Sequence, residues 1–231
     1  MSNTLKVKLW TLVGTAALVA GGTISCANRE AAQPQEAAQP QATENSQHNS
    51  HTGSAGMAHG DMMAMDLGPK DESFDLRFID GMMLHHQGAI AMAESAQGNS
   101  SRPEIKQLAA DIITAQEQEI SQMQQWREAW YPNAEAQPMM YSAEMGHMMA
   151  MPEEAQAAMK MDVDLGKADE QFDQRFIDAM IPHHEGALDM AKEALEKSDR
   201  PEIRQLAENI LSSQQQEIDQ MEEWRKTWYG Q

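Results

Sequence analysis

A segment of 58 residues occurs twice in this chain, and the duplication constrains the fold more than any other feature. Residues 74–131 and 172–229 align without gaps at an offset of 98 residues, with 33 of 58 aligned positions identical. Apolar residues recur in each copy at steps of three and four, which is typical of amphipathic helices. In the first copy this stripe consists of Phe78, Met82, His85, Ala89, Met92 and Ala96.

Each copy predicts two helices joined by a short turn. Gly98, Asn99 and Ser100 interrupt the first helical pattern. The string from Ser101 to Glu104 then predicts a capping box, in which the hydroxyl and the carboxylate bond free amides at the start of the next helix. Asp199 takes the place of Ser101 in the second copy. No strand pattern is present, so the sequence predicts an all-α protein.

A two-helix hairpin cannot cover its own apolar stripe, whereas two packed copies can. We therefore expect residues 66–231 to form a ferritin-like four-helix bundle made of the two duplicated hairpins. The hairpins span 71–131 and 169–230, and residues 132–168 form a long, irregular, Met-rich crossover between them.

The amino-terminal region predicts export. Lys6 and Lys8 precede a short apolar run, so residues 1–26 read as an export signal that directs the protein to the periplasm. Cys26 stands where a lipoprotein signal has its lipidated residue, which would anchor the protein to the membrane; ordinary cleavage and free release is the alternative. Residues 27–65 are rich in Ala, Gln and Pro and predict a disordered tether, with a Met/His cluster at 57–65.

Charge and cysteine content exclude several classes of function. The net charge is −19, and removal of the signal, which carries two Lys and no acid, makes it −21. Such a chain is unsuited to nucleic acids, which are bound through Lys and Arg. Cys26 is the single cysteine, so disulfides within the chain and multi-thiolate metal sites are excluded.

A His-His pair lies in the first helix of each copy and predicts a duplicated metal site. The rings of consecutive residues lie about 100° apart on a helix and would straddle its inward face. The alternative is a hydrogen-bonded core histidine, His85 paired with Glu119, with Met filling core gaps. In both copies, Met residues lie three positions before and seven positions after the first His, and this spacing favours a metal site over core packing. The candidate ligands are His85, His86, Met82, Met92 and Met123, and His183, His184, Met180, Met190 and Met221.

Methionines outside the long helices indicate a second kind of site. Of 20 Met, four lie in residues 57–65 and eight in residues 139–161. Thioethers with an interspersed imidazole suit Cu(I) and Ag(I), which prefer soft ligands; a hydrophobic loop or a sink for oxidants is the alternative. The candidates are Met139, Met140, Met145, His147, Met148, Met149 and Met151. Sites built on His with an ordinary pKa of about 6.5 should empty between about pH 7.5 and 5, whereas thioether sites should not.

Other side chains are expected to have structural roles. Trp126, Trp130, Trp224 and Trp228 are expected to close the bundle ends as core aromatics. We expect Arg77 with Asp80, and Arg175 with Asp178, to form ordinary surface or inter-helix pairs, and Asp80 could alternatively orient an imidazole.

The two copies share a longer motif that resembles a known family. It reads Phe-x-x-x-Phe-Ile-Asp-x-Met-x-x-His-His-x-Gly-Ala-x-x-Met-Ala, followed by Gln-x-x-Glu-Ile-x-x-Met-x-x-Trp. The motif is similar to that of the bacterial domain of unknown function 305 family, and the match covers both hairpins. The resemblance implies a ferritin-like helical bundle. The predicted export signal and the Met-rich segments look especially like those of the copper-binding members of this family. This resemblance implies that the helical ligands named above sequester Cu(I), Ag(I) and Cu(II) outside the cytoplasm.

The leading hypothesis is a non-enzymatic protein that buffers copper in the periplasm or hands it to an efflux or sensor protein. A ferritin-like di-iron oxidase is one alternative, but it needs Glu-x-x-His on two helices. That string occurs once, from Glu144 to His147 in the crossover. A structural envelope module with core histidines is the other alternative. No activated Ser, catalytic Cys or phosphate-binding Gly loop indicates an enzyme.

Overall fold

The structure is a computed structural model that describes residues 66–230. The predicted export signal with Cys26, the tether and the Met/His cluster at 57–65 lie outside the described residues. None of the helices between residues 66 and 230 is both long and apolar enough to span a membrane.

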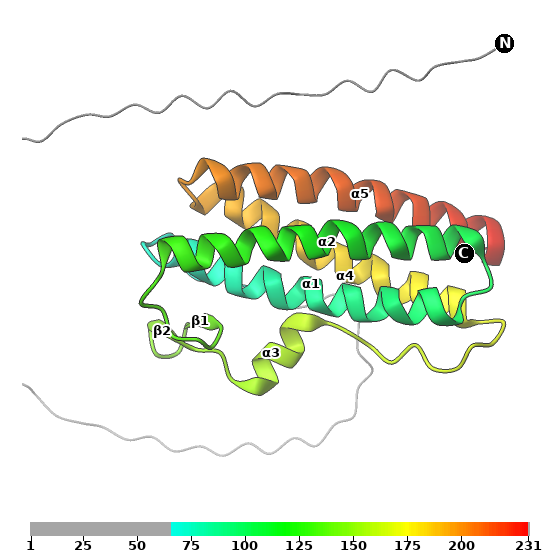
Figure 1. The fold of residues 1–231 in the computed structure, drawn as a ribbon, viewed down its shortest axis with the longest axis horizontal. Helices are drawn as coiled ribbons and strands as arrows, with labels where there is room; N and C mark the ends of the chain where they lie inside the picture. The colour runs from blue at the N-terminus through cyan, green and yellow to red at the C-terminus, as the bar shows by residue number, and fades with distance from the viewer. Residues whose placement is uncertain (1–65, 231) are drawn as a thin grey trace, which may run out of the picture. The chain divides into compact units, whose positions relative to one another are not determined.

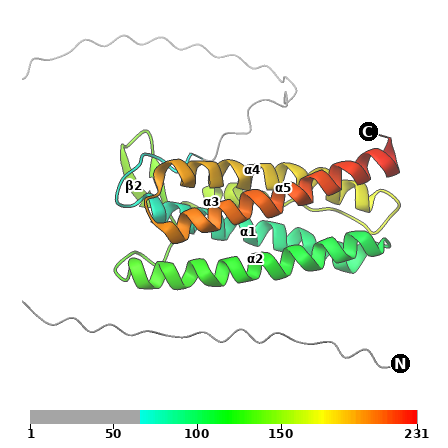
Figure 2. The same cartoon turned by 90° about the horizontal axis from the view of Figure 1, so that it is seen from above.

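Four long helices make up most of the described part of the chain (Figure 1). They are α1 (Phe74–Asn99), α2 (Pro103–Trp130), α4 (Phe172–Lys197) and α5 (Pro201–Tyr229). Within each hairpin the two helices pack along their length, and the hairpins pack against each other through α1 and α4 (Figure 2). The predicted all-α bundle of two helical hairpins is therefore confirmed.

Each half of the core contains side chains from both hairpins, which is the arrangement expected when two copies are related by an approximate two-fold axis. One cluster of buried side chains combines Met92, Leu108 and Ile112 with Phe172, Met180 and Met221. The other combines Phe74, Met82 and Met123 with Met190, Ile203 and Ile210. The carboxyl half of α1 thus meets the amino half of α4, so these helices are antiparallel and neither hairpin buries its stripe alone.

The hairpin turns also reach across to the opposite hairpin. Arg102, between α1 and α2, pairs with Asp173 at 3.4 Å and lies over the Trp228 ring at 4.2 Å. Arg200, between α4 and α5, makes the equivalent contacts with Asp75 at 3.2 Å and with Trp130 at 4.2 Å. These reciprocal contacts hold both ends of the bundle together.

The tryptophans are not the core aromatics that the sequence predicted. They are partly exposed and stack in pairs, Trp126 on Trp130 at 5.2 Å and Trp224 on Trp228 at 5.0 Å. Residues spaced by four on a helix stack along its surface. An arginine from the other hairpin then covers one ring of each pair, a contact between hairpins that the sequence cannot display.

The predicted capping boxes are absent. The second helix of each hairpin begins at a proline, and its N-cap residue, Arg102 or Arg200, makes no side-chain cap bond. The Ser100 and Ser198 hydroxyls instead accept hydrogen bonds from the Arg102 and Arg200 amides, at 3.0 and 3.1 Å. A residue before proline prefers an extended backbone, and a proline at the first helical position needs no amide partner.

The crossover from α2 to α4 runs the length of the bundle, because α4 starts at the end opposite to the end of α2 (Figure 1). It is not irregular throughout, as the sequence had suggested. Strands β1 (Met139–Ser142) and β2 (His147–Ala150) form an antiparallel hairpin, and α3 (Glu153–Lys160) follows. These strands lack Val, Ile and Thr, so propensity gave no signal. The strands form instead because the chain turns at Gly146, whose φ is 69°, and because the hairpin contacts α1.

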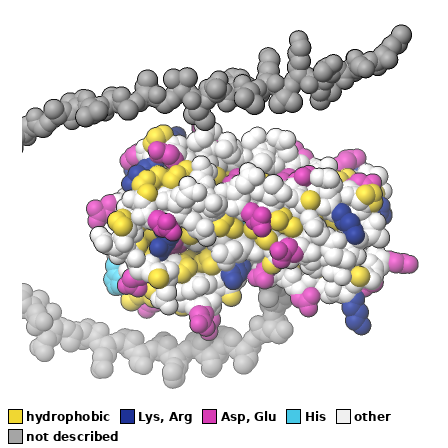
Figure 3. Space-filling model, viewed as in Figure 1, with side chains coloured by type: hydrophobic (Ala, Val, Ile, Leu, Met, Phe, Trp, Pro, Cys, Tyr) yellow, Lys and Arg dark blue, Asp and Glu magenta, His cyan; other side chains and the backbone are white. Residues whose placement is uncertain are grey.

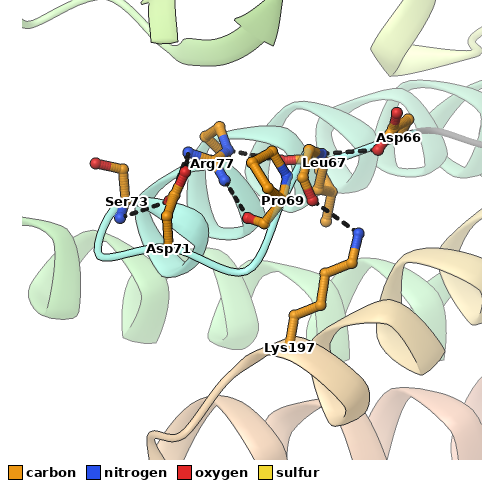
Figure 4. A network of polar contacts seen from close by, with 8 residues as sticks. Asp66, Leu67, Pro69, Asp71, Ser73, Arg77 and Lys197 are labelled. Atoms are coloured by element: carbon orange, nitrogen blue, oxygen red, sulfur yellow. Dashed lines mark hydrogen bonds and ion pairs between the residues drawn. The ribbon is translucent and has the colours of Figure 1, made fainter. Parts of the chain in front are cut away.

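Arg77 does not pair with Asp80. Its guanidinium is 1 % exposed and lies in a loop that precedes α1 (Figure 4). It donates to the carbonyls of Leu67 at 2.6 Å and Pro69 at 2.7 Å, and it pairs with Asp71 at 3.0 Å. Arg175 repeats the bonds to its own preceding loop. Each arginine therefore fixes the chain that enters its hairpin.

Asp80 instead anchors the crossover. Its buried carboxylate pairs with Arg127 of α2 at 2.5 Å and accepts the Met139 amide of β1 at 2.9 Å. Burial raises the pKa of Asp80 even though both partners act to lower it. No imidazole is bonded to it, so the predicted role in orienting a ring is wrong.

Replacing Asp80 by Ala should destabilise the protein by about 3 kcal/mol, because Arg127 and the Met139 amide would lose their acceptor. Asp178 is the matched control: it is its counterpart in the repeat, 43 % exposed, and lies 3.8 Å from Arg225. Asp178→Ala should cost less than about 1 kcal/mol. Urea unfolding of both variants measures the difference, and equal losses would contradict the anchoring role.

A fragment of residues 66–131 should be poorly folded, since each core cluster needs side chains from both hairpins. Residues 66–230 serve as the control and should unfold cooperatively. Thermal circular dichroism with size-exclusion chromatography makes the comparison. A cooperative melt of the monomeric fragment would show that each hairpin is a domain of its own.

Candidate metal centre

The two His pairs meet at the middle of the bundle. His85 and His86 lie near the midpoint of α1, His183 and His184 near the midpoint of α4, and all four side chains are 0–1 % exposed. Because α1 and α4 are antiparallel, their midpoints are opposite each other. The His85 and His183 rings are accordingly in contact, with centroids 3.9 Å apart and planes inclined by 46°.

One histidine of each pair is held by a glutamate on the neighbouring helix. His86 Nε2 donates to Glu119 at 2.6 Å, and His184 Nε2 donates to Glu217 at 2.6 Å. A carboxylate accepts, so Nε2 carries a proton, and in the neutral form of the ring Nδ1 keeps its lone pair. This carboxylate–imidazole arrangement also orients metal-binding histidines. The alternative that paired Glu119 with His85 is wrong: the bond belongs to His86, because its ring faces α2.

His183 is held by the crossover. Its Nε2 donates to the backbone carbonyl of Lys160, the last residue of α3, at 3.0 Å. A carbonyl can only accept, so Nδ1 of His183 also keeps a lone pair. The approach needs Gly88: a Cβ there would lie 1.8 Å from the Lys160 oxygen.

His85 has no hydrogen-bond partner at either ring nitrogen, although it is fully buried. The Nδ1 atoms of His86, His183 and His184 are likewise buried without a partner, as are the side-chain oxygens of Gln116 and Gln214. Burying a polar atom without a partner costs free energy, and such atoms therefore need an explanation. Lone pairs of imidazoles at the centre of a bundle are suited to a metal ion.

Burial keeps the central rings neutral. Burial, followed by repulsion from His183, holds the pKa of His85 well below its ordinary value of 6.5. Burial, followed by repulsion from His184, lowers the pKa of His183 to about 3, although the hydrogen bond to the Lys160 carbonyl acts to raise it. With an ordinary pKa, all metal sites built on these histidines would lose their metal by pH 5. That expectation does not hold for His85 and His183, because their pKa values are lowered. Both rings are in the protonation state that binds metal across the neutral and mildly acidic range.

The six predicted helical methionines are all buried, at 0–2 % exposure. They fall into two triplets, each with two members from one hairpin and one from the other: Met82, Met123 and Met190, and Met180, Met221 and Met92. Both triplets lie within apolar clusters, so core packing accounts for them as well as metal binding does. Their role as ligands stays a prediction.

The crossover methionines are divided between a cavity and the surface. Met139, Met140 and Met151 line a cavity of about 50 Å³ together with Met159, another of the eight crossover methionines. Met149 lies opposite Met140 in the hairpin, and Met148 is half-buried. Met145 and His147 are exposed near the hairpin turn. The structure thus brings together only part of the predicted set.

The available donors are soft or neutral. Among residues 66–230 no three His, Cys, Asp or Glu side chains converge in a way that could hold a metal ion. Asp and Glu are instead spread over the surface, as the face in Figure 3 shows. A metal inside the bundle would therefore be held by imidazole and thioether at low coordination number, which suits Cu(I) and Ag(I).

The sequence does not indicate that Lys160 and two glycines contribute to the centre, and it indicates Met161 only as one of the eight crossover methionines. Gly186 is the counterpart of Gly88, and a Cβ there would lie 3.1 Å from His85 Nε2 and 3.3 Å from Met161 Sδ. The repeat carries a further signal, because Met161 and Met63 occupy equivalent positions before an Asp-Leu-Gly string at the same offset of 98 residues.

Comparison with known proteins agrees with the fold. CopM in its Cu(I)-bound form is 37 % identical, over 67 % of this chain and 97 % of that one, with a TM-score of 0.52. CopM in its Cu(II)-bound form is 38 % identical over the same shares, with a TM-score of 0.54. An uncharacterized protein of Acanthamoeba polyphaga mimivirus, L153, is 43 % identical over 49 residues. That match covers 21 % of this chain and only 32 % of the curated relative.

A family model also matches this chain, and the match covers both hairpins. It matches residues 25–127 and 75–225, and its description is Domain of unknown function (DUF305). The resemblance that the repeated His-His motif indicated is thereby confirmed, and the chain belongs to the DUF305 family.

Proposed function

We propose that this protein binds copper, as Cu(I) and also as Cu(II), with Ag(I) as a surrogate for Cu(I). The observation that carries the proposal is His85, a fully buried imidazole with both nitrogens unpartnered, in contact with the His183 ring. Three further imidazoles beside it each have a buried Nδ1 without a hydrogen-bond partner among residues 66–230. A metal ion would give these atoms the partner that the protein does not supply.

The chemistry of the centre favours a soft, monovalent ion. Burial keeps His85 and His183 neutral, and no cluster of carboxylates among residues 66–230 compensates a high charge. Cu(I) and Ag(I) accept two or three soft ligands, whereas Zn(II) usually takes four and iron prefers oxygen. The similarity to CopM, solved with Cu(I), Cu(II) and Ag, supports the same choice.

We further propose that the protein works outside the cytoplasm as a copper buffer or carrier and not as an enzyme. The basic, apolar start of the chain supports export to the periplasm, and Cys26 supports a lipid anchor there. A copper efflux or sensor protein would be the recipient of the metal. The di-iron alternative finds less support, because within residues 66–230 the only carboxylates bonded to the buried histidines are Glu119 and Glu217.

The first test concerns the choice of metal. In competition with a chelator of known affinity, the protein should bind Cu(I) and Ag(I) more tightly than Zn(II), and Fe(II) more weakly still. Replacing both His85 and His183 by Leu should remove at least one equivalent of Ag(I). Changing the exposed His147 to Leu is the control and should leave the buried centre unaffected. Tight Zn(II) binding without Cu(I) or Ag(I) binding would refute the proposal.

The second test concerns pH. Protons compete with metal for an imidazole only near and below its pKa, and burial places that of His183 at about 3. Ag(I) bound at His85 and His183 should therefore remain bound from pH 7.5 to 5 and be released as the pH approaches 3. Equilibrium dialysis of the wild type and of the double Leu variant isolates this fraction. Its release near pH 6.5, as for an exposed histidine, would contradict the buried site.

A further inference from the structure

Gly186 of α4 lets two groups from distant parts of the chain approach the same point. A Cβ at Gly186 would lie 3.1 Å from His85 Nε2 and 3.3 Å from Met161 Sδ. His85 belongs to α1, whereas Met161 ends α3 in the crossover. An imidazole nitrogen without a hydrogen-bond partner among residues 66–230 thus lies close to the same point as a thioether sulfur.

The end of α3 contacts both halves of the pseudo-two-fold centre. The Lys160 carbonyl lies against Gly88 and accepts from His183, while the Met161 sulfur lies against Gly186 beside His85. Each glycine is three residues after the first His of its pair, in both copies of the repeat. Glycine weakens a helix interior, so its presence at both positions fits a need for close approach.

Met161 has a backbone conformation that is unfavourable for its residue type. Its φ is 49°, and it is the only non-glycine residue with positive φ among residues 66–230. Helices commonly end with a residue in this left-handed conformation, and glycine is the usual choice. A methionine in this conformation costs stability, but the conformation directs its side chain toward His85. Such strain is often found at functional positions.

We propose that Met161 is a metal ligand, which holds one Cu(I) or Ag(I) ion together with Nε2 of His85. Gly186 leaves the space that the ion occupies. The inference rests on the proposed copper-binding function and extends it to a residue of the crossover. It also gives the ion a path, because Met161 is partly exposed whereas His85 is fully buried.

The ligand set makes metal binding and the docking of α3 interdependent. An ion bridging His85 and Met161 ties the crossover to α1 beside the bond between Lys160 and His183. An ion entering from solvent would meet the thioether first and the imidazole second.

The test uses the full-length protein with ¹⁵N-labelled histidine, and Ag(I) in competition with a fixed chelator. The His85 ring nitrogens report binding at this position, whatever the other methionines bind. Met161→Leu keeps the apolar volume and removes the sulfur. It should weaken Ag(I) binding at His85 by at least about tenfold, since even loss of a group that only orients a ligand costs 10–100-fold.

Gly186→Ala provides a second route to the same site. The added methyl would press on both His85 Nε2 and Met161 Sδ, so it should weaken Ag(I) binding at His85 as well. Alanine favours a helix, so the variant should still fold. The matched control is Gly98→Ala in α1, where a Cβ meets nothing within 4 Å. Met83→Leu is the control for loss of sulfur, because Ile181 occupies its place in the second copy. Neither control should alter the response of His85.

The outcomes separate the inference from the proposed function. Weaker binding in Met161→Leu and Gly186→Ala, with both controls unchanged, supports Met161 as a ligand. An unchanged His85 response in Met161→Leu would make Met161 a packing residue and overturn the inference, while copper binding at the histidines would stand. If Ag(I) perturbed none of the four buried histidines in the wild type, both the proposed function at this centre and the inference would fail.

Discussion

The structure depends on one constraint: a two-helix hairpin of this sequence has an apolar stripe that it cannot bury. The second copy buries it, and the copies are alike, so they pack about an approximate two-fold axis with α1 and α4 antiparallel. The histidine pairs lie near the midpoints of these helices, which is where two antiparallel helices of equal length face each other. The contact between His85 and His183 is therefore a consequence of core packing.

The burial of four imidazoles at that contact determines the chemistry of the centre. Two rings are held by glutamates and one by a backbone carbonyl, and each has a buried Nδ1 without a hydrogen-bond partner among residues 66–230. Burial disfavours protonation of His85 and His183, and the scarcity of nearby carboxylates disfavours hard or highly charged ions. Buried polar atoms without a partner cost free energy, which a bound soft cation would offset.

The crossover breaks the two-fold symmetry. Asp80 anchors β1 through the Met139 amide, whereas Asp178 makes only an exposed, longer contact with Arg225. The end of α3 likewise gives one histidine a carbonyl and places a thioether beside the other. Two copies with 33 of 58 residues in common thus present different surroundings to His85 and His183. The crossover contributes to the centre as well as connecting the hairpins.

The sequence by itself determined the helices, the hairpins and the inward direction of the histidines, because these follow from periodicity within one segment. It also led to the family through a repeated motif. Only the tertiary structure decided which partner each group meets: Glu119 with His86, Asp80 with Arg127, and Lys160 and Met161 beside the central rings. Such contacts join segments whose relative positions are set by packing of the whole bundle. The β-hairpin likewise arises from a local turn and contact with α1, which residue propensities do not record.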